Sequence, residues 1–161
     1  LAVSRKLGEK VAAGVAINYH LFSSTNAFYQ PTDAFTFNIG LLYRINEKID
    51  IGFQAFNPTK TLLSDKLNET IPAEYRFGIK YVLTDNIDLY SDAVQVSAQD
   101  LNTTAGLELS RGKYKVRGGF GLNSNIALGF GYEASKLNID IAASYHNRLG
   151  FSPSVNLRYA L

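Results

Sequence analysis

Apolar and polar residues alternate with a period of two along almost the whole chain. In the clearest segment, residues 71–83, one face carries Ala73, Tyr75, Phe77, Ile79 and Tyr81, and the other carries Glu74, Arg76, Gly78 and Lys80. Successive side chains of a β-strand point to opposite faces, so this period predicts strands with one apolar and one polar face. We expect about eleven strands and no helix, over residues 1–6, 11–21, 35–44, 49–55, 71–83, 87–96, 105–109, 114–122, 126–133, 137–146 and 155–161.

The links between the expected strands are alternately short and long. Short polar links lie at residues 7–10, 46–48, 84–86, 111–113 and 135–136, and each has a length found in hairpins. Longer links fall between them at residues 23–33, 57–70, 98–102 and 147–154, while the link at 123–125 is short where a long one is due. Transmembrane β-barrels have short periplasmic turns and longer external loops, so the alternation favours this architecture.

Strand length and aromatic positions favour the same architecture. The expected strands are close to the length of about ten residues that a tilted strand needs to cross the hydrocarbon layer. Aromatic residues lie toward the ends of the apolar faces, as in the girdles of membrane barrels. The chain is therefore interpreted as one all-β domain, residues 1–161, with the fold of an antiparallel up-and-down transmembrane β-barrel in the outer membrane, in contact with lipid. A soluble ligand-binding β-barrel is the architectural alternative.

The number and direction of the strands add two expectations. If the long links are external, the last strand runs inward and the C-terminus lies on the periplasmic side. Single-chain bacterial barrels have even strand numbers, whereas eleven strands are expected here and the first begins in mid-strand at Leu1. We therefore interpret the chain as the C-terminal part of a larger barrel of about twelve to fourteen strands.

The polar faces of the expected strands carry charges of both signs. In a barrel interior such groups pair across strands or line a wet passage, and balanced signs favour pairing and a plugged or narrow lumen. The lumen-facing candidates are Arg44, Asp50, Glu74, Arg76, Lys80, Lys115, Arg117, Glu133, Asp140 and Arg158, with Glu108 on the same polar faces.

Composition narrows the function classes. The chain has 16 Lys+Arg against 14 Asp+Glu and no basic cluster, so nothing favours nucleic acid as a partner. It contains no Cys, which excludes thiol catalysis and Cys-ligated zinc. His20 and His146 lie far apart in the chain without the spacing of metal ligands, so neither a metal nor another cofactor is expected.

One group of residues has the types that hydrolases use. Ser144 and His146 are two residues apart on one face, and Asp140 shares that face. A polar strand end at the external rim explains the same pattern more simply. The paired glycines at 119 and 121 and at 129 and 131 lack the other features of phosphate-binding loops and are interpreted as positions where the wall bends. We therefore expect the protein not to be an enzyme.

Four segments carry a resemblance to known barrels: residues 53–58 (FQAFNP), 71–81 (IPAEYRFGIKY), 116–119 (VRGG) and 146–153 (HNRLGFSP). Together they resemble the C-terminal half of a group of Bacteroidetes outer-membrane barrels. That group is similar to the fatty-acid-transporter-like superfamily and includes accessory barrels of the type IX secretion apparatus. The resemblance implies the barrel fold and the outer membrane, with a role in transport or protein secretion.

Two functions remain open within this architecture. The first is an accessory or scaffold subunit of an envelope or secretion assembly, and the alternative is a passage for hydrophobic or small solutes. The scaffold function is favoured by three apolar residues in an expected external loop, Leu62, Leu63 and Leu67. Leu63 and Leu67 lie four apart, so a short helical turn would present them to a partner protein as one patch. The same leucines could instead fold inward and cap the barrel mouth.

Overall fold

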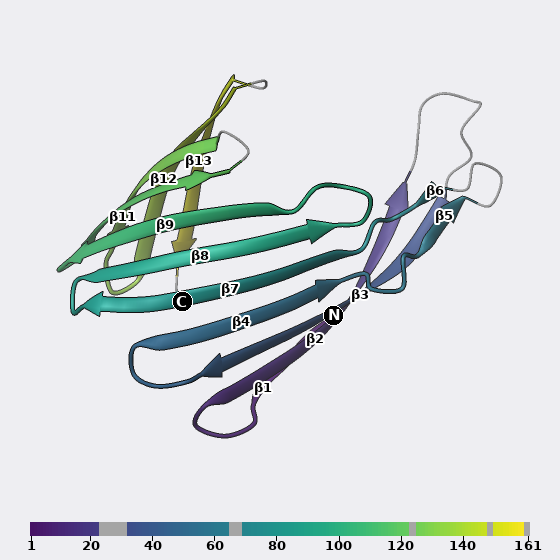
Figure 1. Cartoon of the computed structure of the whole chain (residues 1–161), viewed down its shortest axis with the longest axis horizontal. Helices are drawn as coiled ribbons and strands as arrows, with labels where there is room; N and C mark the ends of the chain where they lie inside the picture. Colours follow the sequence, from purple (N-terminus) through teal and green to yellow (C-terminus); the bar gives the residue numbers. More distant parts are fainter. Residues whose placement is uncertain (23–31, 65–68, 123–124, 148–149, 160–161) are drawn as a thin grey trace. The chain divides into compact units, whose positions relative to one another are not determined.

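The computed structural model describes residues 1–22, 32–64, 69–122, 125–147 and 150–159. Eleven strands form one antiparallel sheet in the order β1-β2-β3-β4-β7-β8-β9-β10-β11-β12-β13. Strands of this sheet that follow one another in the sequence are therefore neighbours in the sheet (Figure 1). These strands are β1 (Ala2–Lys6), β2 (Val11–Phe22), β3 (Thr32–Arg44), β4 (Ile49–Phe56), β7 (Glu74–Thr84), β8 (Ile87–Val96), β9 (Asn102–Arg111), β10 (Tyr114–Gly121), β11 (Asn125–Glu133), β12 (Leu137–His146) and β13 (Gly150–Tyr159).

All eleven strands predicted from the alternation are present, and four of them begin three or more residues from the predicted start. β3 and β9 each begin three residues earlier, at Thr32 and Asn102. β7 begins at Glu74 rather than at residue 71, since Pro72 has no N–H to donate to a neighbouring strand. β13 begins at Gly150 and runs through Pro153, which lies opposite Ala143 of β12. Proline is tolerated there because β13 is the last strand of the described sheet and has a single neighbour. The long link expected at residues 147–154 is therefore wrong, and the link covers residues 147–149.

A separate two-stranded element, formed by β5 (Leu62–Ser64) and β6 (Glu69–Thr70), follows β4. Side-chain hydroxyls join it to β3: Thr61 Oγ1 donates to the Phe35 carbonyl at 2.8 Å, and Thr32 Oγ1 donates to the Leu63 carbonyl at 3.0 Å. The helical turn predicted to start at Leu63 is wrong, because Leu62 and Leu63 are extended. Leu67 lies outside the described residues.

Apolar side chains are on the exposed face of the sheet. Among the residues described, the buried apolar ones are three alanines, Ala34, Ala55 and Ala73. Large apolar residues are instead exposed, including Ile79 at 41% and Leu157 at 65%. Such continuous apolar surface is the outer face of a membrane barrel, where lipid covers it. In the described part of the chain, no helix is long and apolar enough to span a membrane.

Aromatic pairs meet across strands near the strand ends. Tyr114 lies opposite Tyr132, with ring centroids 5.4 Å apart, at the end of the β10–β11 pair. Tyr19 lies opposite Phe35, with centroids 5.0 Å apart, near the ends of β2 and β3. Each tilted pair is of the kind that adds about 0.5–1.5 kcal/mol beyond its buried area. These contacts agree with the aromatic positions predicted for the strand ends.

The chain divides into two compact units. The first unit consists of Leu1–Ile45, Ile51–Phe77 and Val94–Leu101, and the second of Asn46–Asp50, Gly78–Ala93 and Asn102–Leu161. Each unit has a polar face of its own, and the two polar faces differ in the residues that they carry.

Candidate functional site

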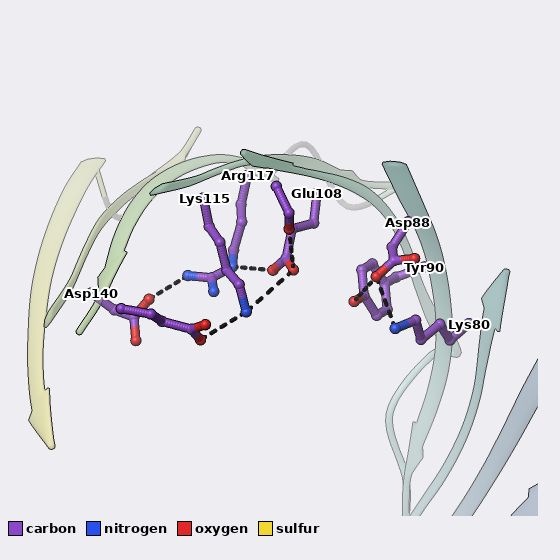
Figure 2. Close-up of polar contacts among 9 residues, drawn as sticks. Lys80, Asp88, Tyr90, Glu108, Lys115, Arg117 and Asp140 are labelled. Atoms are coloured by element: carbon purple, nitrogen blue, oxygen red, sulfur yellow. Dashed lines mark hydrogen bonds and ion pairs between the residues drawn. The ribbon is translucent and has the colours of Figure 1, made fainter. Parts of the chain in front are cut away.

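The polar face of the second unit carries a network of five charged side chains, called the charge lattice below: Glu108, Lys115, Arg117, Glu133 and Asp140. They come from four consecutive strands, β9 to β12. The antiparallel register places Glu108 directly opposite Arg117, and Gly131 lies opposite both Lys115 and Asp140. In Figure 2, Glu108, Lys115, Arg117 and Asp140 lie on the concave side of the arch that these strands form.

Both cations of the charge lattice have two carboxylate partners. Arg117 Nε lies 2.5 Å from Glu108 Oε2, and Arg117 Nη1 donates to Asp140 Oδ1. Lys115 Nζ lies 2.7 Å from Glu133 Oε1 and 3.8 Å from Glu108 Oε1. The Glu108 side chain, 12% exposed, therefore joins the two cations into one network. Three carboxylates against two cations leave the charge lattice with one formal negative charge.

Glycine at position 131 makes room for the one ion pair of the charge lattice that joins strands which are not neighbours. Arg117 is on β10 and Asp140 is on β12, so their ion pair passes over the intervening strand β11. A Cβ atom at Gly131 would lie 2.7 Å from Asp140 Oδ1 and 3.1 Å from Arg117 Nη1, closer than a carbon atom can approach without displacing them. The ion pair therefore occupies the space that a side chain at position 131 would fill.

A second, smaller group lies between β7 and β8 in the same unit. Lys80 Nζ is 2.8 Å from Asp88 Oδ2, and the Tyr90 hydroxyl donates to the same oxygen at 3.3 Å. The ammonium group also lies 5.7 Å from the centre of the Tyr90 ring, within cation–π range (Figure 2). The Lys80 charge is thus paired and partly covered.

A recess of about 540 Å³ lies beside the charge lattice. Glycine and alanine make up much of its floor, because the register puts Gly106, Gly119 and Ala127 in one cross-strand row and places Gly129 beside Ala142 in the next. Leu107, Leu128 and Ile141 line the recess as well. Its polar border is formed by Tyr90, Glu108, Arg117 and Asp140. The recess therefore combines a smooth, mostly apolar floor with one edge of mutually paired charges.

The predicted lumen-facing residues fall into separate groups in the structure. Lys115, Arg117, Glu133 and Asp140 meet in the charge lattice, and Lys80 pairs with Asp88. Glu74 and Arg76 pair with each other on β7, at 3.1 Å. Arg44 is at the end of β3, Asp50 is in β4, and Arg158 of β13 lies opposite Asn138.

The sequence did not identify Asp88 and Tyr90 as members of the site. It also did not show that Gly131 leaves space for the Arg117–Asp140 ion pair. Asp88 and Tyr90 lie on the strand with the weakest alternation, where apolar and polar positions are hard to assign. The available signal for Gly131 was the pair of glycines on β11, between a strand with two cations and a strand with an aspartate. That signal indicates space above β11, but only the register shows that Asp140 fills it.

The polar face of the first unit is centred on Thr36, which is fully buried. His20 Nε2 lies 2.9 Å from Thr36 Oγ1, and Asn18 Nδ2 donates to the same oxygen at 3.4 Å. We call these three residues the Thr36 cluster.

His146 is in the second unit, on β12 with Ser144 and Asp140. Within the described ranges, no group of three or more potential ligand residues is arranged to hold a metal ion.

Comparison with solved structures identifies similar folds. The chain is similar to the toluene transporter TbuX of Ralstonia pickettii, with a TM-score of 0.68 and 14% sequence identity, over 99% of this chain and 66% of TbuX. Two mutants of a porin from Rh. blastica each match with a TM-score of 0.60 and 11% identity, over 94% of this chain and 55% of the porin. No protein-family model and no curated protein matches the sequence.

These similarities establish the fold. The chain has the architecture of a transmembrane β-barrel and spans 66% and 55% of the lengths of the barrels that it matches. The apolar exposed face of its sheet fits that architecture.

Proposed function

We propose that the protein lies in the outer membrane and provides a passage for small, uncharged or weakly polar solutes, without enzymatic activity. The observation that carries this proposal is the recess of the second unit, where a floor rich in glycine and alanine adjoins charges that pair with one another. Small residues keep the wall thin, and paired charges exert a weaker field on a solute than unpaired charges do. TbuX is a toluene transporter, and its similar fold is consistent with this proposal.

Swelling of liposomes that contain the purified protein tests the passage. Small uncharged sugars should enter and swell the vesicles, and the substitution Gly129→Phe should slow the swelling because it fills the recess floor. A Cβ atom at Gly129 meets its neighbours at 3.6 Å or more, so the wall accepts a side chain there. Gly118→Ala is the matched control, since a Cβ atom added at Gly118 would lie on the opposite face of β10, 3.6 Å from Leu128 Cδ2. Vesicles that fail to swell with the folded wild-type protein would overturn the proposal.

A second candidate function is an accessory or scaffold subunit of an envelope assembly, as in the type IX secretion barrels that the sequence resembles. It is favoured by Leu62, which is 45% exposed on β5 although it belongs to a polar connection. Replacing Leu62, Leu63 and Leu67 with serine tests it. Loss of co-purifying envelope proteins with unchanged solute entry supports the scaffold, whereas changed entry without dissociation indicates that the leucines belong to a lid.

We also propose that the short turns and the C-terminus face the periplasm. A protease site inserted at residues 59–61, in the connection before β5, should then be cut on intact cells. The same site inserted at residues 85–86, between β7 and β8, should be protected. The reverse accessibility would contradict this orientation.

A further inference from the structure

Arg117 is the one cation among the described residues that line the recess. Its side chain is 36% exposed, so solutes in the recess can approach it. A guanidinium group has a planar set of donors that matches carboxylate and phosphate groups, and an unpaired arginine in a recess is a strong anion-binding group. The recess thus contains the main component of an anion site.

The two carboxylates beside Arg117 cancel this property. Glu108 approaches Nε and Asp140 approaches Nη1, so two directions of the guanidinium group are already occupied by anions. Glu108 is supplied by the neighbouring strand, directly opposite Arg117. Asp140 comes from two strands away and reaches Arg117 over β11.

Gly131 is the residue that permits the second carboxylate. Any side chain at this position would begin with a Cβ atom 2.7 Å from Asp140 Oδ1, and the ion pair would have to move. At Gly129, the other glycine of β11 beside Arg117, a Cβ atom would lie 3.6 Å from Arg117 Cβ, which is an ordinary contact. The two glycines therefore differ in their effect on the ion pair.

We propose that the recess contains a masked anion site, in which Glu108 and Asp140 neutralise Arg117 and Gly131 is the positioning residue that lets Asp140 do so. The proposal rests on the passage proposed above and adds its charge selectivity: uncharged solutes pass, and anions gain no advantage from Arg117. Unmasking Arg117 should convert the recess into an anion-preferring site.

The test is the reversal potential of the protein in planar lipid bilayers under a potassium chloride gradient. Asp140→Asn keeps the shape of the side chain and removes its charge, so the chloride-to-potassium permeability ratio should rise by about tenfold or more. One unit charge a few ångströms away changes the local concentration of an ion by about threefold to fivefold in water, and it acts on chloride and potassium in opposite directions. In Asp140→Asn/Arg117→Gln the cation that lost one of its two carboxylates is absent as well, and the ratio should return close to that of the wild type.

Glu133→Gln is the control for the total charge. It removes the same charge from the charge lattice, but Glu133 pairs with Lys115 and does not contact Arg117. A masked site predicts a clearly smaller shift for Glu133→Gln than for Asp140→Asn. Equal shifts would mean that only the net charge matters and would overturn the proposal.

The positioning by Gly131 is tested by adding Asp140→Asn to two backgrounds. In Gly131→Ala the ion pair is already displaced, so Asp140→Asn should change the permeability ratio much less than it does in the wild type. In Gly129→Ala it should change the ratio as much as in the wild type, whatever Gly129→Ala does to the conductance itself. Equal effects in the two backgrounds would exclude Gly131 as the positioning residue.

The outcomes separate this inference from the proposed function. If the folded wild-type protein neither conducts ions nor swells liposomes, the passage fails. If it conducts and Asp140→Asn leaves the permeability ratio unchanged, the passage stands and the masked site is wrong. Should Asp140→Asn not fold, Glu108→Gln removes the other neutralising carboxylate and is expected to shift the ratio in the same direction.

Discussion

The Thr36 cluster of the first unit and the charge lattice of the second stabilise polar faces of the same kind of sheet by different means. Around the Thr36 hydroxyl the partners are an amide and an imidazole, and Thr36 itself is fully buried. Around Arg117 the partners are ions, and the side chains of Arg117 and Asp140 stay 36% and 35% exposed. The central hydroxyl of the Thr36 cluster is packed into the wall, with Asn18 and His20 partly buried, and the central ion pair of the charge lattice remains in contact with solvent.

The cost of desolvation accounts for this difference. Burying a hydroxyl group that keeps its hydrogen bonds costs little, whereas removing an ion from water costs several kcal/mol even when it is paired. A neutral polar cluster can therefore be buried completely, but a charge lattice is stable at the edge of a wet recess. The recess and the proposed passage are accordingly found beside the charges.

The largest effect on stability is expected when a charge is placed on the apolar face of the sheet. Ile79 lies at the middle of β7 on the apolar face, and its neighbour Lys80 points to the polar face, where it meets Asp88. Ile79→Arg should lower the free energy of unfolding by about 2–4 kcal/mol, since a charge at mid-depth faces lipid. Urea-induced unfolding in lipid vesicles, followed by the electrophoretic mobility of unheated samples, measures this change.

Ile79→Leu is the control for this prediction, because it alters shape without charge. Gly78 is an unsuitable control, since a Cβ atom there would lie 2.5 Å from Asp92 Oδ1 and would disturb the polar face itself. Equal stability of Ile79→Arg and Ile79→Leu would mean that Ile79 does not face lipid.

A smaller effect is expected at Asn57, a second buried neutral group of the first unit. Its Nδ2 donates to the Ile71 carbonyl at 2.7 Å, and its Oδ1 accepts from Thr61 Oγ1 at 2.7 Å and from Thr59 Oγ1 at 3.2 Å. Its φ of 44° is in the left-handed region, which asparagine tolerates better than alanine. Asn57→Ala should therefore lower the free energy of unfolding by about 2–3 kcal/mol.

The variant Asn57→Gly separates the two causes in the same unfolding assay. It loses the same side-chain hydrogen bonds without the backbone cost, so it should be about 1 kcal/mol more stable than Asn57→Ala. If both variants match the wild type, Asn57 does not anchor the connection before β5.

The alternation predicted the eleven strands and their apolar faces because it is a local property of each strand. It did not predict β5 and β6, which are three and two residues long and too short to show a period. It also placed the start of β13 too late, because Gly150 and Pro153 are typical of loops, although a strand with one neighbour accepts them.

The sequence was less informative about the charge lattice. It assigned Arg117, Glu108 and Asp140 to polar faces but could not pair them, since pairing depends on the register between strands. The Arg117–Glu108 pair follows from the register of one hairpin, β9–β10. The Arg117–Asp140 pair depends on the registers of β10–β11 and of β11–β12, and on the space that glycine leaves at position 131. Contacts across one hairpin are thus easier to predict than contacts across two.

Removal of the central cation should destabilise the charge lattice moderately and in a salt-dependent way. Arg117→Leu leaves Asp140 without its guanidinium partner and leaves Glu108 with the longer contact to Lys115 at 3.8 Å and the hydrogen bond from Ser110 Oγ at 3.3 Å. The groups are partly exposed, so we expect a loss of about 1–2 kcal/mol at low salt. The difference from the wild type should shrink in 1 M sodium chloride, where the screening length is about 3 Å. A loss that is independent of salt would indicate packing, not charge, as its cause.

The smallest effect is expected in the Thr36 cluster. Thr36→Val has nearly the same shape and removes the oxygen that His20 and Asn18 contact. One net hydrogen bond is worth about 1 kcal/mol, and the longer contact at 3.4 Å adds little, so the free energy of unfolding should fall by about 1 kcal/mol. Since neither of these two contacts is an ion pair, the loss should be the same in low and high salt. Thr36→Ser keeps the hydroxyl and removes the buried methyl group instead, so it is the matched control that separates the hydrogen bonds from the packing. A salt-dependent loss in Thr36→Val would show that charges stabilise this face as well, and the contrast between the two units would then no longer hold.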